Sequence, residues 1–209
     1  MNTATCAFSG VSNDKRYCPL KPITLGRVWR ICVSIFFLLS LLFIAWPLMA
    51  ANKLGEERIQ NRSDNAAKMV LGIISYTRWP VPPTVIRLCV VPQTDYAEML
   101  FNPALMQTAH PIKTVHYPQI DASIAANCDV IYLGRIEAQK RQELAILLTG
   151  YPVLTISEDY DECTVGSAFC LLLEDKQASF KVNMDALARV GVRVHPSVLQ
   201  LARKKADAL

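Results

Sequence analysis

The residues with the clearest potential for chemistry are four cysteines that follow residue 51. Cys89, Cys128, Cys163 and Cys170 form an even set, which allows three disulfide pairings. Cys163 and Cys170 flank a short segment that can turn back on itself, so we expect them to bridge, and Cys89 then pairs with Cys128 by elimination. Loop-closure entropy gives about 2.5 kcal/mol for the short loop and about 4 kcal/mol for the long one, as upper estimates.

A metal site is the main competing interpretation of these cysteines. The C-x6-C spacing is not typical of zinc ligands, and His110, His116 and His195 show no H-x3-5-H pattern beside a cysteine pair. We therefore predict no metal and no cofactor. Inert structural staples and a redox switch both remain open as roles for the two disulfides.

The acidic loop at residues 158–162 is the strongest candidate for other chemistry. It places four carboxylates after a predicted strand, where ligand sites of α/β sheets occur. It lacks the D-x-D-x-D-G register of a calcium loop, and we interpret it as a solvated turn leading into Cys163. His195 precedes Pro196 at a predicted helix start, and we interpret it as a capping or surface histidine rather than a general base. The serine-hydrolase, P-loop and dinucleotide-binding glycine motifs are missing after residue 51. We predict no catalytic residue and a protein that is not an enzyme.

Alternating strands and helices are predicted to position these residues. Helical periodicity starts at Ser63 and ends before Trp79 and Pro80. Beyond it we expect strands at 85–91, 129–133 and 153–156, helices at 96–100 and 137–148, a hairpin of 169–173 with 178–182, and two short helices at 183–190 and 196–205. The predicted fold class is α/β, a single-domain sandwich with a mostly parallel sheet covered by helices, a C-terminal hairpin and two short helices.

The N-terminal region has the pattern of an export signal. Arg27 and Arg30 precede an apolar stretch at residues 31–45, and small residues near Ala50 offer a cleavage site. We expect residues 1–51 to be a signal peptide or an uncleaved anchor, residues 52–63 a polar linker, and residues 64–209 the α/β domain. Because the positive flank stays in the cytoplasm, the domain is expected in the periplasm.

The charge distribution argues against a nucleic-acid partner. The net charge of +4 arises before the apolar stretch, and the remainder holds 17 of the 22 Lys and Arg residues against 17 of the 18 Asp and Glu residues. Binding to a phosphate backbone requires a clustered excess of positive charge. With 52% hydrophobic residues, the chain has enough apolar material for one core.

Several segments together resemble the YfiR family of periplasmic repressors of Gram-negative bacteria, over roughly residues 64–205. They are Ser75-Tyr76-Thr77-Arg78-Trp79-Pro80, the long spacing between Cys89 and Cys128, residues 166–170, residues 180–192, and residues 196–205 with Pro196-Ser197-Val198-Leu199. The resemblance implies an α/β sandwich with two disulfides that inhibits an inner-membrane diguanylate cyclase through the cyclase's periplasmic domain. Cyclic-di-GMP would then fall, and with it exopolysaccharide and biofilm formation. The family is also regarded as redox-responsive, and the long N-terminal extension departs from it.

Two other function classes stay open beside the regulator, namely a periplasmic small-ligand receptor and, less favoured, a hydrolase using the acidic loop. For the regulator, a homodimer is an additional option. We expect the cyclase to contact an apolar stripe on the closing helices, and core packing of the same residues is the alternative. The residues of this predicted partner surface are Leu187, Val190, Val192, Val198 and Leu199.

Overall fold

The computed structural model describes residues 25–161, 163 and 165–203. The chain divides into two compact units, residues 1–50 and residues 51–209, which are treated separately below. Residues 1–24 of the expected signal peptide lie outside the described residues. Helix α1 (Leu25–Ser75) contributes to both units, and its residues 51–75 belong to the second. No membrane-spanning helix is found in the part of the chain that is described.

The expected polar linker at residues 52–63 is helical and forms part of α1, so that prediction is wrong. Glu, Arg, Lys and Gln dominate this segment, and all four are strong helix formers, so the single Gly55, at about 1 kcal/mol, does not interrupt the helix. Ser63, expected to cap a new helix, is buried inside α1. The helix also continues through Trp46 and Pro47.

A six-stranded sheet forms the centre of the second unit among the described residues. Its order is β3-β2-β4-β5-β6-β7, and neighbouring strands are parallel except for the antiparallel β6–β7 hairpin. This confirms the predicted α/β class. The strands are β2 (Ile86–Val91), β3 (Ile112–His116), β4 (Val130–Leu133), β5 (Leu154–Ser157), β6 (Phe169–Leu173) and β7 (Ala178–Val182), while β1 (Thr77–Arg78) pairs with β8 (Arg193–Val194) in a separate ribbon.

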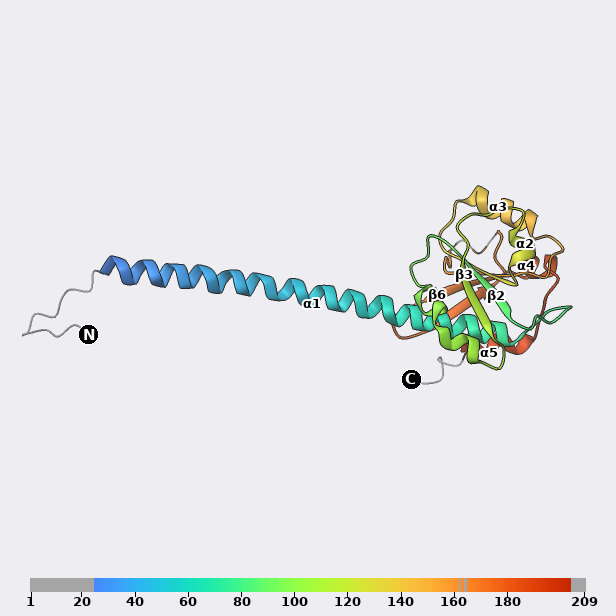
Figure 1. Cartoon of the computed structure of the whole chain (residues 1–209), viewed down its shortest axis with the longest axis horizontal. Coiled ribbons are helices and arrows are strands. Elements are labelled where there is room, and N and C mark those ends of the chain that lie inside the picture. The colour runs from blue at the N-terminus through green and yellow to red at the C-terminus, as the bar shows by residue number, and fades with distance from the viewer. Residues whose placement is uncertain (1–24, 162, 164, 204–209) are drawn as a thin grey trace, which may run out of the picture. The chain divides into compact units, whose positions relative to one another are not determined.

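Apolar layers cover both faces of the sheet (Figure 1). On one face, Leu88 of β2 and Tyr132 of β4 pack in a cluster with the C-terminal part of α1, the short helices η1 (Glu98–Phe101) and η2 (Pro103–Gln107), and the closing helices η3 (Pro196–Val198) and α5 (Leu199–Arg203). On the other face, Cys89 and Ile131 pack in a second cluster with α2 (Ile124–Asn127) and α3 (Ala138–Leu147). Strand alternation therefore sends successive residues of one strand into different cores.

The chain reverses its direction of travel across the sheet between β2 and β4. The connection from β2 to β3 crosses the first face through η1 and η2, whereas the return from β3 to β4 crosses the second face through α2. The connections leaving the carboxyl ends of β2 and β4 thus turn to opposite faces. Such a reversal opens a crevice where ligands of open α/β sheets commonly bind.

A backbone hydrogen bond joins two loops at this reversal point. The amide of Arg135 donates to the carbonyl oxygen of Gln93 at 3.2 Å, which joins the loops that follow β4 and β2. At Gly134 a Cβ atom would lie only 1.9 Å from that same carbonyl oxygen. Glycine is therefore required here because no side chain fits between the two loops.

We predict that Gly134→Ala lowers the free energy of unfolding by about 2–3 kcal/mol, since backbone rather than a flexible side chain must move. Gly55→Ala is the matched control, because nothing lies within 4 Å of its Cβ position on α1. That control should be neutral or stabilising by up to about 1 kcal/mol. Urea unfolding of both variants measures the difference, and equal stability of the two would contradict the close approach.

Candidate functional site

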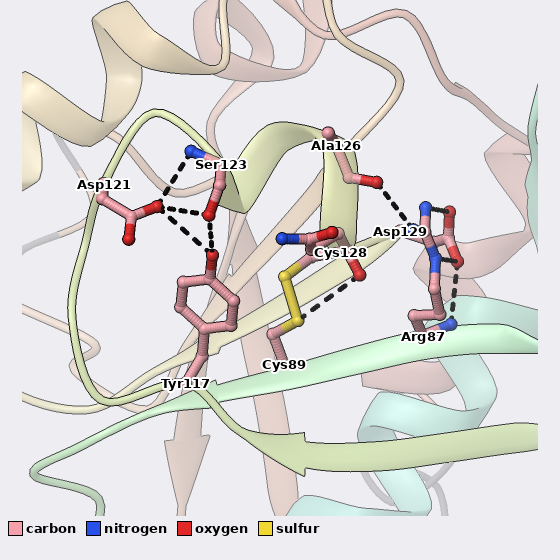
Figure 2. Close-up of a disulfide and its surroundings, with 9 residues drawn as sticks. Arg87, Cys89, Tyr117, Asp121, Ser123, Ala126, Cys128 and Asp129 are labelled. Atoms are coloured by element: carbon pink, nitrogen blue, oxygen red, sulfur yellow. Dashed lines mark hydrogen bonds and ion pairs between the residues drawn. A yellow bond between two sulfur atoms is a disulfide. The ribbon is translucent and has the colours of Figure 1, made fainter.

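The disulfide between Cys89 and Cys128 fastens the second face of the sheet (Figure 2). Cys89 lies in β2 and Cys128 directly follows α2, with their Cα atoms 5.8 Å apart. Both side chains are fully buried in the second core cluster. The bridge therefore holds a helix of one turn, which is too short to be stable alone, against a central strand.

An ion pair next to this disulfide reinforces the same attachment (Figure 2). The guanidinium of Arg87 donates to both carboxylate oxygens of Asp129, at 3.0 and 2.8 Å, and the Arg87 amide donates to the same carboxylate at 2.8 Å. A further guanidinium nitrogen donates to the carbonyl oxygen of Ala126 in α2 at 2.6 Å. Arg87 thus satisfies a carbonyl at the C-terminal end of α2, where a cation is favourable.

The start of α2 is held by a separate group of polar side chains (Figure 2). The hydroxyl and amide of Ser123 both donate to Asp121, at 2.6 and 2.8 Å. The hydroxyl of Tyr117, from the loop after β3, also donates to Asp121 at 3.2 Å and contacts the Ser123 hydroxyl. Hydrogen bonds from Ser123 lower the pKa of Asp121, so the turn favours the ionised carboxylate.

The second disulfide joins Cys163 to Cys170, with a Cα–Cα distance of 5.6 Å. Cys170 lies in β6, and Cys163 lies in the loop that precedes it. The side-chain amide of Asn183 donates to the carbonyl oxygen of Cys163 at 3.0 Å, and its oxygen accepts from the Ala186 amide at the start of α4 (Met184–Arg189). The bridged loop is therefore tied to the first closing helix. Cys163–Cys170, expected from spacing, and Cys89–Cys128, expected by elimination, are thus the two pairs that form.

The predicted partner surface does not form one stripe. Val192 and Val198 are only 6% and 4% exposed and belong to the first core cluster, so these two residues are wrongly assigned to a binding surface. Leu187 and Val190 are partly buried against the same cluster, whereas Leu199 is 49% exposed. The reason is that β8 pairs with β1 between the two closing helices, and α4 and α5 consequently lie apart (Figure 1).

In the acidic loop, the carboxylate of Glu158 is half-buried and hydrogen-bonded. Its carboxylate accepts from the amides of Asp95 at 2.6 Å and Tyr96 at 3.1 Å, and from the hydroxyl of Tyr132 at 3.0 Å. The prediction of a solvated turn is therefore wrong at this position. Burial raises the pKa of Glu158, and the hydrogen bonds from Asp95, Tyr132 and Tyr96 oppose the rise. Burial likewise raises the pKa of Tyr132 well above its usual value.

The Glu158 carboxylate is linked to α1 through Tyr96 in the loop after β2. Tyr96, whose amide donates to Glu158, accepts a hydrogen bond on its hydroxyl from Arg62 of α1 at 3.0 Å. Arg62 also pairs with Asp175 in the β6–β7 turn at 2.7 Å, and Arg58 approaches the same carboxylate at 3.5 Å. The network is polar and structural, and it brings no nucleophile beside a base. In the described residues no group of three metal-ligating side chains occurs.

Some of these groups could be predicted from the sequence and others could not. The ring nitrogen Nδ1 of His195 accepts from the Ser197 amide at 3.2 Å, so of the two roles expected for this histidine the structure shows the capping one. The pairing of Arg87 with Asp129 was missed, because residues so far apart in the chain carry no local signal. Glu158 was open to prediction, since it is the first residue after β5 at the carboxyl edge of the sheet.

A model of the YfiR/HmsC-like family matches residues 63–203, which include both disulfides and the whole sheet. The chain belongs to the YfiR/HmsC-like family. Membership of this family supports a role as a periplasmic regulator of diguanylate cyclase signalling. The matched region begins within α1, so this family domain includes the part of α1 that covers the sheet.

We predict that Glu158 makes the stability of this YfiR/HmsC-like protein fall as pH rises. A carboxyl group whose pKa is raised by folding contributes stability below its ordinary value of 4.5, and the contribution is lost as pH rises through the folded pKa. The stability of the wild type relative to Glu158→Gln should therefore fall as pH increases from about 4 to 7. Urea unfolding of both proteins across this range measures the difference. A relative stability that rises with pH would contradict the burial of this carboxylate.

Proposed function

We propose that this protein is exported to the periplasm, where it binds the periplasmic domain of an inner-membrane diguanylate cyclase and inhibits it. Cyclic-di-GMP then falls, and exopolysaccharide and biofilm formation fall with it. The observation that carries the proposal is the family match over residues 63–203. Residues 1–51 act as the signal peptide or remain as an anchor.

Two features of the chain support this location and role. Two disulfides within one domain are typical of proteins that mature in an oxidising compartment such as the periplasm. The apolar stretch at residues 31–45, preceded by Arg27 and Arg30, has the order of charge and hydrophobicity of an export signal. A regulator of this kind acts by binding and requires no catalytic residue.

Deletion of the gene tests the proposal in the cell. We expect cellular cyclic-di-GMP to rise in the deletion strain and to return when the wild-type gene is restored, because the cyclase is released and then inhibited again. A receptor or hydrolase unconnected with the cyclase would leave the nucleotide unchanged. Measurement of cyclic-di-GMP in extracts distinguishes these outcomes, and an unchanged level would overturn the proposal.

For the partner surface we retain the exposed part of the closing helices, centred on Leu199 of α5. An exposed leucine beside a buried valine offers apolar contact without disturbing the core, whereas Val198 cannot reach a partner. Leu187 lies on the separate helix α4 and Val190 directly follows that helix, in which Met184 is 68% exposed. A homodimer would use a surface of the same kind. Sedimentation of the purified protein distinguishes a monomer from a homodimer.

We predict that Leu199→Glu weakens binding of the cyclase domain about tenfold or more and raises cyclic-di-GMP while the protein stays folded. The matched control is Ile146→Glu on α3, which changes a 67% exposed isoleucine outside the closing helices and should retain inhibition. Val198→Glu should remove the folded protein from the periplasm, because it buries a charge. Immunoblots and cyclic-di-GMP measurements report both effects. Full inhibition by Leu199→Glu would exclude this surface.

A further inference from the structure

We propose that the crevice at the reversal point of the sheet is a binding site for a small zwitterion, such as a short peptide with free termini. The cavity has a volume of about 500 Å³ and is formed by the loops after β2, β3 and β4 together with the first turns of α3. It is separate from both disulfides and from the proposed partner surface. The inference does not rest on the proposed cyclase inhibition.

The position of the cavity follows from the topology. It lies outside the carboxyl ends of β3, β2 and β4, and the chain reverses its direction of travel between β2 and β4. Open α/β sheets place ligands at this point because the connections on its two sides leave for opposite faces. The volume also falls within the range of small-molecule sites.

Several contacts hold the walls of the cavity in place without a ligand. The backbone bond from Arg135 to Gln93 joins two of its loops, and Gly134 allows their close approach. The half-buried carboxylate of Glu158 binds the amides of Asp95 and Tyr96, which follow Gln93 in the same loop. A preformed site loses little conformational freedom when a ligand binds.

The charges that line the cavity are balanced and alternate along one face of α3. Lys140 and Glu143 of α3 are spaced by three residues and lie on the same side of the helix, and Glu137, the N-cap residue directly before α3, lines the same cavity. Lys140 has no hydrogen bond or ion pair with another described residue, whereas the Glu143 carboxylate accepts from Gln139 at 3.0 Å. Arg135 adds a second cation, oriented by Asp95 at 2.5 Å.

This arrangement selects for a ligand that carries both signs of charge. An anion alone would be attracted by Lys140 and Arg135 but repelled by Glu137 and Glu143. A cation alone would be attracted by the two glutamates but repelled by the two basic side chains. A zwitterion can direct its carboxylate to the lysine and its ammonium group to a glutamate. The apolar part of the lining, which would contact the body of the ligand, consists of Val91, Pro92, Pro118, Ile120 and Ile136.

Amide chemical shifts of the exported, disulfide-bonded protein test this site with dialanine as the probe. We expect dialanine at up to about 10 mM to shift the amides of Gln93, Gln119 and Ile136 in a saturable manner. N-acetyl-dialanine, which lacks the cation, and dialanine amide, which lacks the anion, should each bind at least about tenfold more weakly. Lys140→Gln and Glu143→Gln should weaken dialanine binding to a similar extent.

Lys113→Gln is the matched control, because this exposed lysine of β3 lies outside the cavity, and it should leave dialanine binding unchanged. Glucose serves as an uncharged polar probe and should not shift these amides. The proposal is overturned if dialanine causes no saturable shift, if the single-charge derivatives bind equally well, or if glucose binds as tightly at the same residues. Cyclic-di-GMP measurements on the deletion strain are independent of all these outcomes.

Discussion

The two-sided burial of β2 and β4 is the constraint on which the rest of the structure depends. Leu88, Val90, Val130 and Tyr132 require a cover on one face, while Cys89, Val91, Ile131 and Leu133 require another. The first face is covered by a long helical segment of α1, which is anchored through Arg62 and Asp175. The second face is covered by α2 and α3, which have only four and ten residues. This second cover is the part that needs covalent support.

A disulfide and an ion pair accordingly secure the cover of the second face. The disulfide from Cys89 to Cys128 and the ion pair from Arg87 to Asp129 attach the end of α2 to β2, two residues apart on the same strand. The carboxyl ends of the strands are fixed instead by Gly134, Gln93 and the carboxylate of Glu158. A rigid domain with a shaped crevice and exposed apolar positions at its closing helices is suited to binding, and both proposals draw on that property.

The sequence predicted those features that depend on local pattern. The β-branched runs of β2, β4 and β5 and the hairpin gave the sheet, and the separation of Cys163 from Cys170 indicated a local bridge. Strand β3 was missed because it is an edge strand with only Ile112 fully buried, so its residues show no strong alternation. The burial of Val192 and Val198 was equally out of reach, since it follows from the pairing of β8 with β1 across a large part of the chain. The place of Glu158 at the carboxyl edge of the sheet could be predicted from the sequence, but its hydrogen bonds to Asp95 and Tyr96 could not, because they come from the loop after another strand.

Amide hydrogen exchange on the Cys89→Ala/Cys128→Ala variant tests the central claim most directly, namely that the disulfide holds the cover of the second face. In the intact protein the Cys128 amide donates to Ile124 at 3.0 Å and the Asp129 amide donates to Arg87 at 2.9 Å. We predict that the variant loses protection at these amides and throughout α2, while β6 and β7 keep theirs. Unchanged protection in α2, or an equal loss in the β6–β7 hairpin, would contradict the account.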